Sequence, residues 1–114
     1  MQAEMALKKT YDLLNEVGAV RTKKEFCKDW LHRGDSYFRC LKHNRKPPSV
    51  SVIAICSSKL KHYSAALKNK KTGESERLAL EFDLLSNQLD LAIDKQSRHT
   101  WMLHIENEQK SKLD

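Results

Sequence analysis

An unbroken heptad pattern in the last third of the chain most strongly limits what this sequence can fold into. Between residues 78 and 103, the repeat positions are separated alternately by four and three residues. This spacing is typical of one face of a long helix that packs against a second helix. The repeat positions are Leu78, Phe82, Leu85, Leu89, Ala92, Gln96, His99 and Leu103.

A second row of leucines, Leu80, Leu84 and Leu91, lies on another side of the same predicted helix. A helix with two apolar sides is not expected to remain an isolated arm, since that much uncovered apolar surface would associate. We therefore expect one stripe to pack on the rest of the chain and the other on a second copy, in a homodimer. Packing within a monomer alone is the alternative. The residues assigned to dimerisation are Leu78, Phe82, Leu85, Leu89, Ala92 and Leu103.

The first part of the chain, residues 1–72, predicts a unit of four helices. Leu7, Tyr11, Leu14 and Val17 recur at helical spacing, which predicts a first helix from residue 3 to about 17. After two consecutive prolines, Ser49 is expected to cap a fourth helix. Residues 68–73 are polar and flexible in composition, and predict a boundary before a helical dimerisation segment, residues 73–114. The inward face of the fourth helix is predicted to carry Ile53, Cys56, Leu60, Tyr63 and Leu67.

The stretch from residue 22 to residue 43 predicts two short helices joined by a tight turn. Thr22 is expected to cap the first, with Glu25 reaching back to complete a capping box. Gly34 is expected to end that helix in the left-handed conformation. Asp35 or Ser36 is then expected to cap the second helix.

The second of these short helices has two chemically different sides. At about 100° per residue, Phe38 and Leu41 define its buried side. A short helix with a small polar N-terminus and a basic outer face suits the major groove of DNA. The outer face is predicted to carry Ser36, Arg39, Cys40 and His43.

The net charge of +6 conceals a strong asymmetry between the two parts of the chain. Residues 1–72 hold 16 Lys and Arg against 6 Asp and Glu, whereas residues 73–114 hold 5 against 9. A basic first part favours a polyanionic partner, of which nucleic acid is the commonest. A basic surface that is merely solvated is the alternative.

Several classes of function find no support in the sequence. No apolar run approaches the roughly 18 residues that a membrane span needs. The three cysteines are far apart and odd in number, which favours reduced thiols and a cytosolic setting. Neither a phosphate-binding loop, a nucleophile motif nor a metal-ligand pair is present, so we expect no enzyme, no cofactor and no metal site. Cys27 and Cys56 are expected to be buried, and Cys40 to face outward.

Residues 1–67 resemble the lambda-repressor-like (Cro-type, XRE) helix-turn-helix domain. The resemblance is carried by the bulky-then-small pair Phe26 and Cys27, by residues 36–41 as a recognition helix, and by Pro48 and Ser49 at the start of the next helix. It implies an all-α, four-helix helix-turn-helix domain, here followed by the long C-terminal dimerisation helix. The third helix, about residues 35–44, would enter the major groove. The sequence departs from the family in the turn, where one residue is added and the glycine is displaced to Gly34.

The resemblance also implies which residues contact DNA. Arg39 is the strongest candidate to read a base, because its planar fork matches guanine O6 and N7. Tyr37 is equally compatible with packing. The base contacts would come from Asp35, Ser36, Tyr37, Arg39, Cys40 and His43, and the phosphate contacts from Thr22, Lys23, Lys24, Arg45 and Lys46.

We therefore expect a homodimeric, sequence-specific transcriptional regulator that binds double-stranded DNA in the cytoplasm, associated with the nucleoid. A protein-interaction or assembly module, whose basic face is incidental, is one alternative. A plasmid or phage DNA-binding accessory factor without a role at promoters is another.

Overall fold

The computed structural model describes residues 2–113, and all regular secondary structure in this range is helical. The all-α class expected from the sequence is confirmed. The helices follow one another as α1 (Gln2–Glu16), α2 (Lys23–Asp29), α3 (Tyr37–Asn44), α4 (Val50–Asn69) and α5 (Gly73–Leu113).

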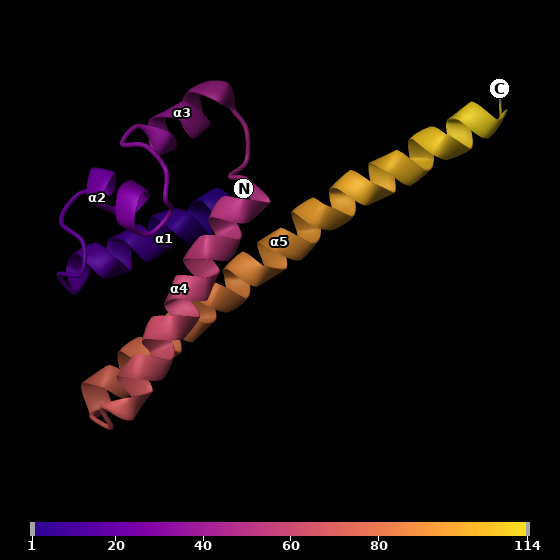
Figure 1. Cartoon of the computed structure of the whole chain (residues 1–114). Helices are drawn as coiled ribbons and strands as arrows, with labels where there is room; N and C mark the ends of the chain where they lie inside the picture. The colour runs from indigo at the N-terminus through magenta and orange to yellow at the C-terminus, as the bar shows by residue number, and fades with distance from the viewer. Residues whose placement is uncertain (1, 114) are drawn as a thin grey trace.

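Helices α4 and α5 form an antiparallel hairpin, which is the largest element of the body (Figure 1). Two polar clips one heptad apart hold the helices together. In each clip, a serine and a lysine four residues apart on α4 contact one aspartate on α5. The repeat keeps the same face of each helix toward the other and fixes their register. The clips are Ser64, Lys68 and Asp83, and Ser57, Lys61 and Asp90, with contact distances of 2.6–2.8 Å.

The heptad stripe of α5 packs inside the protomer. Phe82, Leu85, Leu89 and Ala92 are buried in one core that they share with α1, α2 and α4. Their assignment to a dimer contact is therefore wrong, because α4 and α1 already cover this face. The expected boundary at residues 72–73 is also wrong, since it falls on the turn of the hairpin and the core continues across it.

Aromatic side chains fix the small helices to the rest of the core. Phe26 of α2 lies at the centre, with ring centroids 5.7 Å from Tyr11 of α1 and 5.8 Å from Phe38 of α3. Trp30, just after α2, lies 5.5 Å from Tyr63 of α4. These contacts place α3 on the body through its Phe38 side, leaving its opposite side free to face outward.

The caps of α2 and α4 are as expected. The Thr22 hydroxyl accepts a hydrogen bond from the Glu25 N–H (3.2 Å), and the Ser49 hydroxyl accepts one from the Val52 N–H (3.3 Å). The capping box is displaced by one residue, because Glu25 Oε2 accepts from the Arg21 N–H (3.4 Å) rather than from Thr22.

The connection between α2 and α3 differs from the expected tight turn. It spans seven residues, 30–36. His32, not Gly34, adopts the left-handed conformation (φ 55°), and histidine is among the non-glycine residues that tolerate it best. The Arg33 N–H then donates to the Cys27 carbonyl (2.9 Å), which closes the end of α2. Ser36 occupies the N-cap position of α3, but its side chain makes no capping hydrogen bond.

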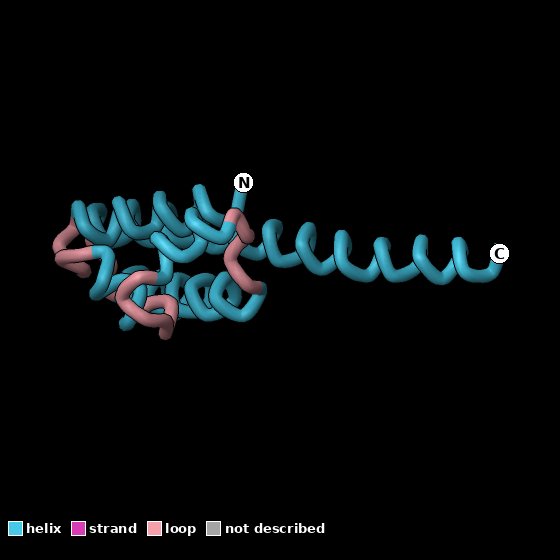
Figure 2. Tube along the Cα trace, turned by 90° about the horizontal axis from the view of Figure 1, so that it is seen from above, coloured by secondary structure: helices cyan, strands magenta, loops and turns pink. Residues whose placement is uncertain are grey.

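The last part of α5 projects beyond the body as a single helix (Figures 1 and 2). Gln96 Nε2 donates to the Pro48 carbonyl (2.9 Å), just before the first turn of α4. Residues 97–111 are all exposed, and we call residues 97–113 the arm. No described helix combines the length and apolar character needed to cross a bilayer.

Candidate nucleic-acid interface

The orientation of α3 agrees with the expectation from its sequence. Leu41 is buried and Phe38 is half-buried against Phe26, whereas the opposite side of the helix is open to solvent. Figure 1 shows α3 at the edge of the body, apart from the projecting arm. The outward side chains Arg39, Cys40 and His43 are all exposed, so the chain's own tail does not cover them.

Positive charge surrounds this open side. Arg45 follows the end of α3 in the left-handed conformation (φ 53°), and Lys46 begins the connection to α4. Lys42 on the flank of α3 is also exposed. It was not among the residues predicted to contact DNA, although its position next to the buried Leu41 already placed it beside the outward side of the helix. Among the residues that the structure describes, none of Arg39, Lys42, Arg45 and Lys46 forms an ion pair.

A second exposed basic group lies at the start of α2. Lys23 and Lys24 are solvent-exposed, and Thr22 is exposed as well. The Thr22 hydroxyl accepts the capping hydrogen bond from the Glu25 N–H, but its proton remains available to an acceptor such as a phosphate oxygen. These residues belong to a different element from the outward side of α3, and α2 meets α3 through Phe26 rather than through its lysines.

The N-terminal end of α3 is partly engaged with the body. Tyr37 is half-buried, and burial raises the pKa of its hydroxyl despite hydrogen bonding to Ser49 and the nearby charge of Arg33. Tyr37 is thus a packing residue that connects α3 with the start of α4. Ser36 Oγ lies 3.7 Å from Cys40 Sγ, while Asp35 is exposed and is the acidic residue nearest to this surface in sequence.

The thiols divide as expected between the core and the surface. Cys27 and Cys56 are buried, and Cys40 is exposed. Burial raises the pKa of Cys27, and it raises that of Cys56 to about 12. Both buried thiols therefore stay protonated near neutral pH and serve as small apolar groups. Within residues 2–113, no group of three or more His, Cys, Asp or Glu side chains is arranged to hold a metal ion.

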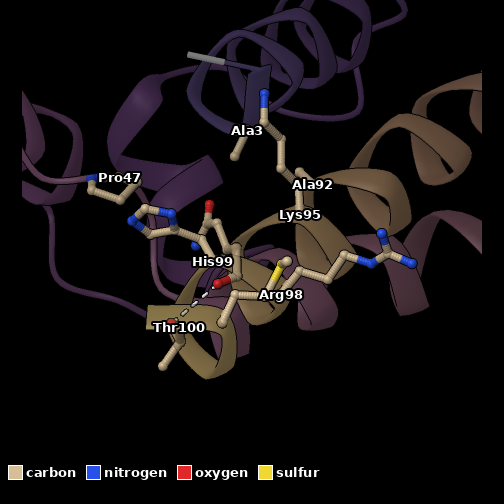
Figure 3. A pocket seen from close by; sticks show the side chains of 9 residues that line it. Ala3, Pro47, Ala92, Lys95, Arg98, His99 and Thr100 are labelled. Atoms are coloured by element: carbon tan, nitrogen blue, oxygen red, sulfur yellow. Dashed lines mark hydrogen bonds between the residues drawn. The ribbon is translucent and has the colours of Figure 1, made fainter. Parts of the chain in front are cut away.

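An open hollow of about 520 Å³ lies where α1, the connection before α4 and α5 meet. Figure 3 shows the His99 ring beside Pro47, the Lys95 side chain extending toward α1 near Ala3, and the Arg98 guanidinium pointing away. The exposed surface of the hollow is largely apolar, and the Thr100 hydroxyl in its lining donates a hydrogen bond to the Gln96 carbonyl (3.1 Å). This hollow marks the base of the arm and lies on α5, not on α3.

Comparison with known proteins identifies one family whose model matches most of the chain. No significant match was found among curated proteins, and none was found among solved structures. The model of a family of unknown function (DUF6626) matches residues 7–102. The match runs from α1 across the hairpin turn and includes most of α5, in agreement with the single core. This chain is therefore a member of the family of unknown function DUF6626.

Proposed function

We propose that this protein is a sequence-specific, double-stranded DNA-binding transcriptional regulator that acts as a homodimer, with α3 in the major groove. The observation that carries the proposal is the open side of α3, where Arg39, Cys40 and His43 are exposed opposite the buried Leu41. A helix anchored by one side and basic on the other is the kind of element that the major groove admits. The resemblance of residues 1–67 to Cro-type domains favours the same reading.

In this proposal, contacts to phosphates provide affinity and contacts to bases provide specificity. Lys23, Lys24, Arg45 and Lys46 contact phosphates, and these contacts supply most of the affinity and make it fall steeply with salt concentration. Arg39 contacts a base, and a bidentate arginine–guanine pair discriminates by roughly 1–3 kcal/mol. The proposal assigns Tyr37 to packing rather than to base reading, since its side chain is half-buried against the core.

The proposal depends on the exposed side of α3 and not on the geometry of a standard motif. The connection between α2 and α3 has seven residues, whereas helix-turn-helix motifs join their helices with three or four. The extra length changes how α2 supports α3 on the duplex, but it leaves the outward side chains uncovered.

Arg39→Ala and Lys24→Ala separate base reading from phosphate binding. Arg39→Ala should lose roughly 10-fold or more of its preference for the specific site over unrelated duplexes, because the base contact is removed. Lys24→Ala should weaken binding to all duplexes by a similar factor and reduce the salt dependence by about one ion. Fluorescence anisotropy titrations at several salt concentrations measure both quantities.

Both substituted side chains are exposed, so circular dichroism should show unchanged helix content. An equal loss of affinity for specific and unrelated duplexes in Arg39→Ala would remove Arg39 from the base-reading role.

A protein-interaction module is the second candidate, and the arm is the observation that favours it. Four apolar side chains of the arm are between 42% and 50% exposed: Trp101, Met102, Leu103 and Ile105. This candidate predicts no binding to duplex DNA at low salt. A plasmid or phage accessory factor would bind duplex DNA, and reporter assays at the selected sites distinguish it by the absence of any effect on transcription.

A further inference from the structure

Apolar side chains remain uncovered at two places along α5. Leu80, Leu84 and Leu91 are 62%, 62% and 68% exposed on the outer side of the hairpin. Met102 is half-exposed on the arm, and Trp101 beside it is equally open. The inner stripe of α5 is buried against α4. The large apolar side chains of this helix that the structure shows exposed are these five together with Leu103 and Ile105.

These two places belong to one straight stripe. At about 100° per residue, Leu80, Leu84, Leu91, Arg98 and Met102 fall within an arc of about 40° on α5. The stripe is symmetric in spacing about its centre. Leu80 and Met102 each lie eleven positions from Leu91, and Leu84 and Arg98 each lie seven positions from it. A stripe with this symmetry can be self-complementary when two copies run in opposite directions.

We propose that a second copy of the chain packs antiparallel along the outer side of α5, with Leu91 at the two-fold axis. In this register Leu91 meets its own equivalent, and Leu80 meets Met102 of the second copy. The arm of each copy lies over the outer leucines of the other copy's hairpin. The same patch serves both copies, so the contact is closed and does not continue into a filament.

The charges beside the stripe fit the same register. Arg77 comes opposite Ile105 of the second copy, one residue before Glu106, and Glu81 comes opposite Trp101, within about one helical turn of Arg98. Arg98 itself belongs to the stripe and comes opposite Leu84 of the second copy, whereas Arg77 and Glu81 lie beside the seam. Opposite charges at such a seam favour one orientation and register over others. A parallel pairing would instead place each of these side chains next to its own equivalent, with like charges in contact.

The contact also accounts for the length of α5. The stripe from Leu80 to Met102 extends over about 33 Å at 1.5 Å per residue. Because the arm projects beyond the body, the C-terminal half of the stripe can reach the N-terminal half of the stripe on another copy. The proposal concerns α5 alone, and it remains valid whether or not α3 binds DNA.

Cysteine cross-linking tests the register directly. In a Cys40→Ser background, the remaining native thiols, Cys27 and Cys56, are buried. Leu91→Cys should give a disulfide-linked dimer under mild oxidation, because the two sulfurs meet at the axis. Leu80→Cys is the matched control and should not, since its two copies lie about 33 Å apart. Leu80→Cys combined with Met102→Cys should restore cross-linking.

Light scattering on the full chain, without added cysteines, should give the mass of a dimer. Leu91→Glu should weaken that dimer by at least 10-fold, because two carboxylates would face each other at the axis. Circular dichroism should be unchanged, since residue 91 is 68% exposed in the protomer. A monomeric full chain, or cross-linking of Leu80→Cys as efficient as that of Leu91→Cys, would overturn the proposal. DNA titrations of the Leu91→Glu monomer show separately whether α3 still binds.

Discussion

The aspartates of the α4–α5 clips show how individual side chains connect the fold to pH. A hydrogen bond from Lys68, together with one from Ser64, lowers the pKa of Asp83. Burial acts to raise the pKa of Asp90, but hydrogen bonds from Lys61 and Ser57 outweigh it and the pKa is lowered. Each carboxylate therefore binds its proton less readily in the folded chain than in the unfolded chain.

The stability of the protein should consequently decrease in acid. The contribution of the clips is fully present above the ordinary aspartate pKa of about 3.9, and it is lost as the pH falls through the lowered values of the folded state. Urea unfolding followed by circular dichroism between pH 7 and pH 3 measures this. The double variant Asp83→Asn and Asp90→Asn should be less stable than the parent at pH 7 and should lose less stability on acidification. Identical pH dependence in both proteins would show that the clips are not responsible.

Helix positions were largely predictable, because local chemistry decides them. Thr22 and Ser49 cap helices where their sequence context predicts, and the apolar spacing of α3 gave the correct buried side. Whether a side chain makes the capping hydrogen bond was less predictable. Ser36 occupies the N-cap position of α3, but its hydroxyl makes no capping hydrogen bond. The left-handed residue after α2 is His32, because the path of the chain into α3 selects the position and glycine merely tolerates such angles best.

The role of each stripe on α5 could not be predicted from periodicity. Both stripes have helical spacing, and the pattern contains no information about which neighbour covers which side. The clips determine which side of α5 packs on α4, because Asp83 and Asp90 lie on the side of α5 that contacts the serines and lysines of α4. Their seven-residue repeat is visible in the sequence, but only the path of the hairpin shows that serine, lysine and aspartate come together. On α3, the outward orientation of Arg39 and His43 was predicted from the sequence, Tyr37 was left open between packing and base reading, and Lys42 is exposed beside them.

Two truncations distinguish the body of α5 from its arm. Ending the chain after Lys71 removes Phe82, Leu85 and Leu89 from the core, and large buried side chains contribute roughly 2–5 kcal/mol each. That loss is comparable with the whole stability of a domain, so this variant should not fold. Ending it after Thr100 should leave a folded body, since residues 101–111 are all exposed.

Thermal unfolding followed by circular dichroism separates these outcomes. A cooperative transition in the shorter variant would show that α1 to α4 form an independent domain and would contradict the single core. Loss of the transition in the longer variant would show that the arm is required for folding.

The whole molecule combines one core with two exposed surfaces of different chemistry. The basic open side of α3 lies in the part of the chain that holds 16 Lys and Arg, and the apolar stripe lies on the more acidic α5. Figure 1 shows α3 on the body and the arm leading away from it. This separation allows a dimer contact along α5 to leave both copies of α3 uncovered, as a regulator that reads two half-sites requires.

Selection of bound sequences from a pool of random duplexes tests whether the protein reads DNA through α3. At low salt, the full chain should enrich a motif of two inverted half-sites. Arg39→Ala should relax one position in each half-site, and Leu91→Glu should retain only a single half-site. A recovered pool with the same composition as the input, or no retention of duplex DNA at low salt, would contradict the claim that α3 reads DNA.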